Sequence, residues 1–135
     1  MAVLFRFEVF TPYRLFFADS VEAISLRLTD GEIGVLAGHS FCTAPVETCV
    51  LRIKNHKGEW RNAFISTGIL EVTEVKTVLM VDTAEWPEEI DTERALAVGK
   101  RARDRLETAM LKFEIDQAKD KIRRSDIRLK VAALG

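Results

Sequence analysis

The chain has 135 residues, of which 47% are hydrophobic and 30% are charged, and its formal net charge is −1 at pH 7. These values are typical of a soluble globular protein with one domain or two small ones, and they exclude a disordered chain. No apolar run approaches the roughly 18 residues of a membrane span, so direct membrane insertion is not expected. The N-terminus, MAVLFRFEVF, alternates apolar and polar residues and lacks the pattern of a secretory signal.

Charge is distributed unevenly along the chain. Residues 1–90 contain 8 Lys and Arg against 13 Asp and Glu, whereas residues 91–135 contain 12 against 8, so the net charges are −5 and +4. Within residues 119–130 two acidic side chains accompany six basic ones: Lys119, Lys121, Arg123, Arg124, Arg128 and Lys130. This segment is expected either to attract an acidic partner or polyanion, or to form a solvated helix face.

The first half of the sequence has the period-two pattern of β-strands. Within residues 3–10, the apolar side chains of Phe7 and Val9 alternate with polar neighbours, which places the two kinds on opposite faces of a strand. Turn residues such as Asp30-Gly31 separate further short strands. These strands are predicted at 14–19, 20–28, 32–36, 48–54, 59–67, 69–75 and 77–82. Many short strands at close spacing predict an antiparallel β-sandwich, or a barrel-like sandwich, over residues 1–86.

The second half has a helical period and predicts an antiparallel two-helix hairpin over residues 87–135. One stripe consists of Ala95, Val98, Ala102, Leu106 and Ala109, and the other of Ala118, Ile122, Ser125, Leu129 and Ala132. The segment LKFEID (111–116) is expected to interrupt the helix, with Asp116 as the next N-cap. We therefore expect helices over about 91–110 and 116–133. Because small residues bury little area, the helices could separate without unfolding the strand domain.

The sequence contains no pattern of a catalytic or metal site. Phosphate-binding loops, G-x-S-x-G, dinucleotide-binding glycine patterns and H-E-x-x-H are all missing. His39 and His56 are solitary, and together with Cys42 and Cys49 they do not provide convincing ligands for zinc. Both cysteines are expected to be small core residues. The sequence therefore favours a binding or coupling protein, and an enzyme built on a β-sandwich is an alternative that no motif supports.

Short motifs in a fixed order resemble those of a known family. They are Thr11-Pro12, Phe17-x-Asp19-x-Val21, Asp30-Gly31-Glu32-Ile33-Gly34-Val35-Leu36, Gly38-His39, Leu51-Arg52-Ile53, Gly68-Ile69-Leu70-Glu71-Val72, Ala84-Glu85, Ile90-Asp91-Thr92-Glu93-Arg94-Ala95 and Arg128-Leu129-Lys130-Val131-Ala132. In this order, with a strand half before a helix half, the chain resembles the epsilon subunit of the bacterial F-type ATP synthase. That subunit is the counterpart of the mitochondrial delta subunit, and the resemblance covers essentially the whole chain.

The resemblance implies a non-catalytic subunit of a proton- or sodium-translocating rotary complex. A ten-stranded β-sandwich would sit at the foot of the central stalk, bind the gamma subunit and the ring of c subunits, and turn with the rotor. Glu32 and His39 match the end of the sandwich that faces the c-ring. The chain would be held peripherally at the cytoplasmic face of the bacterial inner membrane, and no nucleic-acid partner is implied.

The resemblance also implies that the helices move. In the folded state the helices pack on each other. In the extended state they run along gamma and insert between the alpha and beta subunits, which blocks ATP hydrolysis. The six basic residues of 119–130 would then face an acidic surface of the beta subunit. The alternative is a purely structural coupling subunit without nucleotide sensing.

In some members of that family the folded hairpin binds ATP as a regulatory ligand through the motif I/L-D-x-x-R-A, which is intact here at residues 90–95. No cofactor is required. The positions that match the family's nucleotide-binding residues are Glu85, Asp91, Arg94, Arg101, Arg124 and Arg128. The alternative is that Asp91 is only a helix N-cap and Arg94 its exposed (i, i+3) neighbour.

The chain departs from the ATP-binding members in two places. Ser125 and Asp126 stand where those members tend to have alanine and a neutral residue. We expect the carboxylate of Asp126 to lower the phosphate affinity of Arg124. Segment 40–49, SFCTAPVETC, also differs from the usual sequence after the Gly-His pair.

Overall fold

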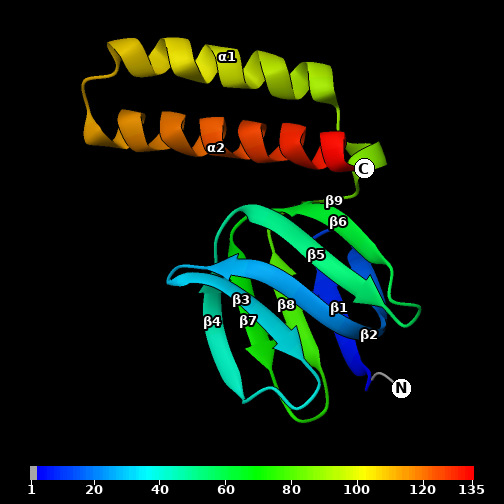
Figure 1. The fold of residues 1–135 in the computed structure, drawn as a ribbon. Helices are drawn as coiled ribbons and strands as arrows, with labels where there is room; N and C mark the ends of the chain where they lie inside the picture. The colour runs from blue at the N-terminus through cyan, green and yellow to red at the C-terminus, as the bar shows by residue number, and fades with distance from the viewer. Residues whose placement is uncertain (1–2) are drawn as a thin grey trace. The chain divides into compact units, whose positions relative to one another are not determined.

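The computed structural model describes residues 3–135 and divides the chain into two compact units, Met1–Glu85 and Trp86–Gly135 (Figure 1). The division falls one residue before the boundary expected from the sequence. Met1 and Ala2, which were assigned to the strand domain, lie outside the described residues. A strand unit followed by a helical hairpin confirms the predicted fold class. Among the described residues, no helix is long and apolar enough to cross a membrane.

The strand unit contains nine strands in the described residues. They are β1 (Phe5–Phe10), β2 (Leu15–Leu28), β3 (Gly31–Leu36), β4 (Cys42–Val46), β5 (Cys49–Asn55), β6 (Trp60–Ile65), β7 (Gly68–Val72), β8 (Thr77–Val81) and β9 (Ala84–Glu85). The expectation of ten strands is therefore wrong for this part of the chain. Segments 14–19 and 20–28 form one continuous strand, because Asp19 and Ser20 keep pairing with β1. The sequence patterns also missed β4, which contains Pro45, and the two-residue strand β9.

The long strand β2 joins the two layers of the sandwich (Figure 1). Its first half pairs with β1, its second half pairs with β3 and β5, and Leu28 at its end pairs with β4. The strands β1, β8, β7 and β4 follow one another in the sheet, and β2 pairs with both ends of this series. Only β1 and β8 run parallel; the other pairs are antiparallel. Because β2 closes this series on itself, the unit is a barrel-like sandwich.

Alternating side chains of the strands fill one core. Phe7 and Val9 of β1 are fully buried, as the period-two pattern predicts. The largest fully buried side chains are those of Phe7, Phe64, Ile24, Leu26, Leu51, Ile53, Ile65, Leu70, Leu79, Val9, Val21 and Val35. Cys49 is buried with them, while Cys42 is half-buried, and both cysteines are free. Gly31 has φ +132°, a conformation that side chains rarely adopt, and it forms the turn between β2 and β3.

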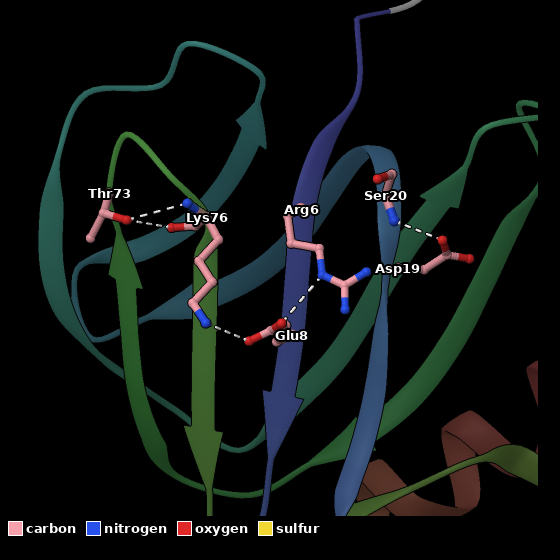
Figure 2. A network of polar contacts seen from close by, with 6 residues as sticks. All are labelled: Arg6, Glu8, Asp19, Ser20, Thr73 and Lys76. Atoms are coloured by element: carbon pink, nitrogen blue, oxygen red, sulfur yellow. Dashed lines mark hydrogen bonds and ion pairs between the residues drawn. The ribbon is translucent and has the colours of Figure 1, made fainter.

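A polar network connects β1 with β8 on the outside of the sheet (Figure 2). The carboxylate of Glu8 accepts hydrogen bonds from Lys76 Nζ at 2.9 Å and from Arg6 Nε at 3.2 Å. The hydrogen bond from Lys76, followed by that from Arg6, holds the pKa of Glu8 below its ordinary value of 4.5, although desolvation opposes the shift. Lys76 is held in turn by Thr73, whose hydroxyl bonds to the backbone of Lys76 on both sides of the turn. These contacts order the β7–β8 turn.

The hairpin unit contains a short 3-10 helix, η1 (Pro87–Glu89), and two long helices, α1 (Thr92–Thr108) and α2 (Lys112–Leu134). Figure 1 shows α1 and α2 lying side by side and antiparallel. Asp91 caps α1, since its Oδ1 accepts a hydrogen bond from the backbone N–H of Arg94 at 3.0 Å, which confirms the predicted cap. The prediction that Asp116 caps the second helix is wrong. That helix begins at Lys112, and Asp116 lies inside it, because only Ala109 to Leu111 leave the helical conformation.

Candidate functional site

The interface between the two helices is made of small side chains. Buried Ala95, Gly99 and Ala102 of α1 face α2, where Ala118 and Ser125 are buried. The hydroxyl of Ser125 donates a buried hydrogen bond of 2.7 Å to the carbonyl oxygen of Ala95. A Cβ atom on Gly99 would lie 2.4 Å from the Ser125 oxygen, so only glycine allows this approach. The mid-helix glycine, which costs about 1 kcal/mol of helix propensity relative to alanine, is therefore a packing residue.

Ion pairs on the two flanks of the hairpin differ from the expected ones. Asp126 Oδ1 lies 2.6 Å from Arg103 Nη2 across the two helices, so it does not neutralise Arg124 as predicted. The carboxylate beside Arg124 is Asp120, one turn earlier, at 3.2 Å from its Nε. That contact lacks hydrogen-bond geometry, and within residues 3–135 the buried Nε–H of Arg124 has no acceptor. The side chain that limits the availability of Arg124 is therefore Asp120.

A groove of about 460 Å³ lies between α1 and α2. Its polar lining consists of Arg101 and Arg105 from α1 and of Gln117 and Lys121 from α2. Its apolar lining consists of Val98, Ala102 and Ala118. No carboxylate takes part in the lining, and Arg101, Arg105 and Lys121 make no ion pair within the described part of the chain. The groove is therefore a concave site with a positive wall on each helix.

Five of the six predicted nucleotide-binding residues lie in the hairpin unit, and Glu85 belongs to β9 of the strand unit. The contact between Ser125 and Ala95 sets the register of the helices. It brings Arg124 and Arg128 of α2 to the level of the first turns of α1, where Asp91 and Arg94 stand. Only Arg101 of this set lines the groove. The basic residues Lys119, Lys121, Arg123 and Lys130 are exposed, and Arg124 and Arg128 are half-buried.

The sequence patterns missed Arg105 and Gln117 as lining residues. Arg105 follows Arg101 by four residues, and Gln117 precedes Lys121 by four. Residues four apart share one face of a helix, so this spacing was the available signal. It was not decisive, because many exposed helix faces carry such pairs without any ligand.

A row of exposed apolar side chains crosses one layer of the strand unit. Register pairs join Pro45 to Ile69, Ile69 to Met80, Met80 to Phe10, and Phe10 to Leu15. The exposed fractions are 46% for Ile69, 47% for Met80, 37% for Phe10 and 54% for Leu15, and Pro45 is also exposed. With strands about 4.8 Å apart, these residues of β4, β7, β8, β1 and β2 form a row roughly 19 Å long. We call it the apolar row.

The two residues that matched the c-ring-facing end lie apart. Glu32 is exposed near the start of β3, opposite Arg27 of β2, whereas His39 follows the other end of β3. The four residues from Glu32 to Leu36 alone span about 13 Å of extended strand. His39 lines a cavity of about 350 Å³ whose rim includes the exposed side chains of Phe41 and Val75. The structure therefore places Glu32 and His39 in two loop regions of the sandwich and not in one cluster.

These surfaces suit binding, and the described residues contain no group of three or more His, Cys, Asp or Glu that could hold a metal ion. The apolar row is the kind of exposed patch that marks contact with another protein. The groove presents donors without acceptor side chains other than the Gln117 amide, so it is chemically complementary to an anion.

Comparison with known proteins agrees with these features. Residues 4–87 match the family model of the ATP synthase delta/epsilon chain, β-sandwich domain. The ATP synthase epsilon chain of Caldicellulosiruptor saccharolyticus is 44% identical over 127 residues, which is 94% of this chain and 92% of that protein. The epsilon chain of Caldanaerobacter subterraneus is 41% identical over 130 residues, or 96% and 94% of the two chains.

Solved structures share the fold. A chain of the Euglena gracilis mitochondrial ATP synthase, in a structure of OSCP, F1 and c-ring, superposes with a TM-score of 0.83 at 23% identity, covering 100% of this chain and 84% of that one. A chain of the Tetrahymena thermophila mitochondrial ATP synthase central stalk and c-ring gives 0.62 at 13% identity, covering 94% and 95%. Because the family model covers more than half of the sequence and the relatives nearly all of it, the chain belongs to the delta/epsilon family of the ATP synthase, among its epsilon chains.

Proposed function

We propose that the chain is a central-stalk subunit of a proton- or sodium-translocating F-type ATP synthase, where it couples the ring of c subunits to the gamma subunit. The observation that carries this proposal is the apolar row across five strands. Exposed apolar side chains rarely line up on the surface of a protein that acts alone. Family membership and the shared fold with rotor-containing assemblies support gamma as the partner on this surface.

The loop regions of the sandwich are proposed to face the c-ring. His39 lines a cavity that has apolar and charged side chains on its rim, and Glu32 is exposed on a separate loop. A carboxylate on such a loop can form charge-assisted hydrogen bonds with basic side chains of a polar c-subunit loop. In this arrangement the chain is peripheral at the cytoplasmic face of the bacterial inner membrane, and it contributes no catalytic residue.

The helical hairpin is proposed to inhibit ATP hydrolysis by opening and inserting between the alpha and beta subunits. Opening costs little, because the buried interface consists of alanine, glycine and serine. One buried hydrogen bond contributes about 1 kcal/mol, and the ion pair between Arg103 and Asp126 is half-exposed on both sides and contributes about 0–1 kcal/mol. The released basic segment 119–130 would then face an acidic surface of the beta subunit.

Deleting residues 91–135 is expected to raise the ATP hydrolysis rate of the assembled complex while the strand unit still binds gamma. The reason is that the deletion removes both helices and leaves the apolar row intact. The measurement is ATPase activity of the complex reconstituted with the full or the shortened chain. An unchanged rate at every ATP concentration would remove the inhibitory part of the proposal and leave a purely structural coupling subunit.

ATP is proposed as the ligand that stabilises the folded hairpin. Asp91, Arg94, Arg101, Arg124 and Arg128 would form the site, with Glu85 contributing from β9. Two observations favour it: the Nε–H of Arg124 is buried without an acceptor, which a phosphate oxygen could supply, and Arg101 lines an open groove. A ligand that binds only the folded state stabilises that state in proportion to RT ln(1 + [L]/Kd), so the hairpin would respond to cellular ATP.

Titration of the full chain with ATP is expected to give a saturable signal by calorimetry. Arg124→Ala should weaken binding by roughly tenfold, because a charge-assisted hydrogen bond contributes about 1.5–3 kcal/mol. Lys100→Ala removes an exposed charge of α1 outside this set and is the matched control. The absence of saturation up to about 10 mM ATP, well above the micromolar to millimolar range of usual ligand constants, would contradict nucleotide sensing.

A further inference from the structure

The groove between α1 and α2 contains a charge arrangement that the nucleotide-binding set does not include. Arg105 and Lys121 line it together with Arg101, and Gln117 adds a neutral amide. Arg101 and Arg105 are one helical turn apart, so their guanidinium groups follow one another along the groove, while Lys121 faces them from α2. The three cations therefore form two walls around an elongated space of about 460 Å³, a volume within the usual range of small-ligand sites.

These cations are available for a ligand. Other arginines of the hairpin are engaged: Arg103 pairs with Asp126, and Arg124 has Asp120 beside it. In contrast, Arg101, Arg105 and Lys121 pair with no carboxylate within residues 3–135. Like charges that face one another across a groove repel, and an anion between them removes that repulsion. The site is therefore selective for ligands with several negative charges.

The lining also indicates what the ligand lacks. The floor consists of Val98, Ala102 and Ala118, with no aromatic face on which a base could stack and no carboxylate to accept hydrogen bonds from a base or sugar. Small side chains on the floor provide no deep apolar pocket for the large anchor residues that dominate peptide recognition. Five donors on a planar guanidinium suit tetrahedral phosphate oxygens better than isolated carboxylates.

We propose that this groove binds a polyphosphate chain of three or more phosphate groups and that it does not read a nucleobase. The chain could be the triphosphate of a nucleotide or an inorganic polyphosphate, since both present the same linked phosphates. The inference goes beyond the proposed rotor function, because it needs neither gamma nor the c-ring. It also stands independently of ATP sensing, which depends on Asp91, Arg94, Arg124 and Arg128.

The test is calorimetric titration of the full chain with inorganic tripolyphosphate, ATP, AMP and a glutamate-rich peptide. Tripolyphosphate should bind saturably, AMP should not compete with it, and added salt should weaken the binding. Arg105→Ala and Lys121→Ala should each reduce tripolyphosphate affinity by roughly tenfold, as expected for the loss of a charge-assisted contact. Lys100→Ala and Lys119→Ala remove exposed charges of α1 and α2 outside the groove, and they should have little effect.

The outcomes separate the possible sources. Binding of tripolyphosphate without ATP binding supports the groove and ends ATP sensing. Binding of ATP that requires Arg124 but not Arg105 or Lys121, with tripolyphosphate silent, overturns the groove and keeps ATP sensing. Equal losses in all four alanine variants would mean general attraction to a basic helix pair, and tighter binding of the glutamate-rich peptide would mean a protein partner; either result overturns the proposal.

Discussion

Gly99→Ala is expected to open the helical hairpin while the strand unit stays folded. The added Cβ would lie 2.4 Å from Ser125 Oγ and 3.1 Å from Ser125 Cβ, and the hydroxyl cannot turn away without losing its bond to Ala95. Overpacking of this kind costs about 1–3 kcal/mol, and the lost hydrogen bond costs about 1 kcal/mol. Alanine returns about 1 kcal/mol of helix propensity, so the net effect favours separation.

Amide hydrogen exchange measures this effect in each unit separately. We expect faster exchange throughout α1 and α2 and unchanged exchange in β1, β5 and β7. The matched control is the double variant Gly99→Ala with Ser125→Gly, which moves the glycine to the other helix and makes room for the new methyl group. It should recover part of the protection. Slower exchange in Gly99→Ala alone would mean that propensity outweighs packing, and our account of the interface would be wrong.

Met80→Glu is expected to weaken binding to the gamma subunit by more than about a hundredfold, because an unpaired charge at the centre of an interface costs several kcal/mol. Met80 stands in the middle of the apolar row, between Ile69 of β7 and Phe10 of β1. Its side chain is nearly half-exposed, so the isolated chain should keep its stability. The measurement is the affinity of the purified chain for gamma.

The control for this variant is His56→Glu. His56 is exposed in the turn between β5 and β6, away from the apolar row in the sheet order, and the change adds the same charge. It should leave affinity for gamma unchanged. If both variants lost affinity equally, net charge and not the apolar row would control binding. If neither did, gamma would bind another surface.

The strand unit was predictable where burial alternates strictly. Phe7 and Val9 follow period two because β1 has one buried face and one solvated face. The pattern failed for β2, since polar Asp19 and Ser20 resemble a turn although they continue to pair with β1. It failed for β4 because Pro45 resembles a strand break, whereas its position opposite Ile69 on the surface tolerates proline.

The hairpin site was less predictable than the fold. The cap at Asp91 follows from local hydrogen bonding, and sequence alone indicates it. The start of α2 at Lys112 does not, because the three-residue break before it has no capping side chain. Ion pairs between helices depend on their register, so the pairing of Asp126 with Arg103 required the structure. The same holds for Arg105 and Lys121, which only the folded hairpin brings together.

Rotary coupling is the central claim, and reconstitution tests it most directly. A membrane-bound ATP synthase assembled without this chain is supplied with the wild-type protein or with Met80→Glu, and ion pumping per ATP hydrolysed is measured. We expect the wild type to restore coupled pumping and to remain associated with gamma, and we expect Met80→Glu to do neither. Full coupling in the complex that lacks the chain, or equal restoration by Met80→Glu, would contradict the proposal that the apolar row joins this subunit to the rotor.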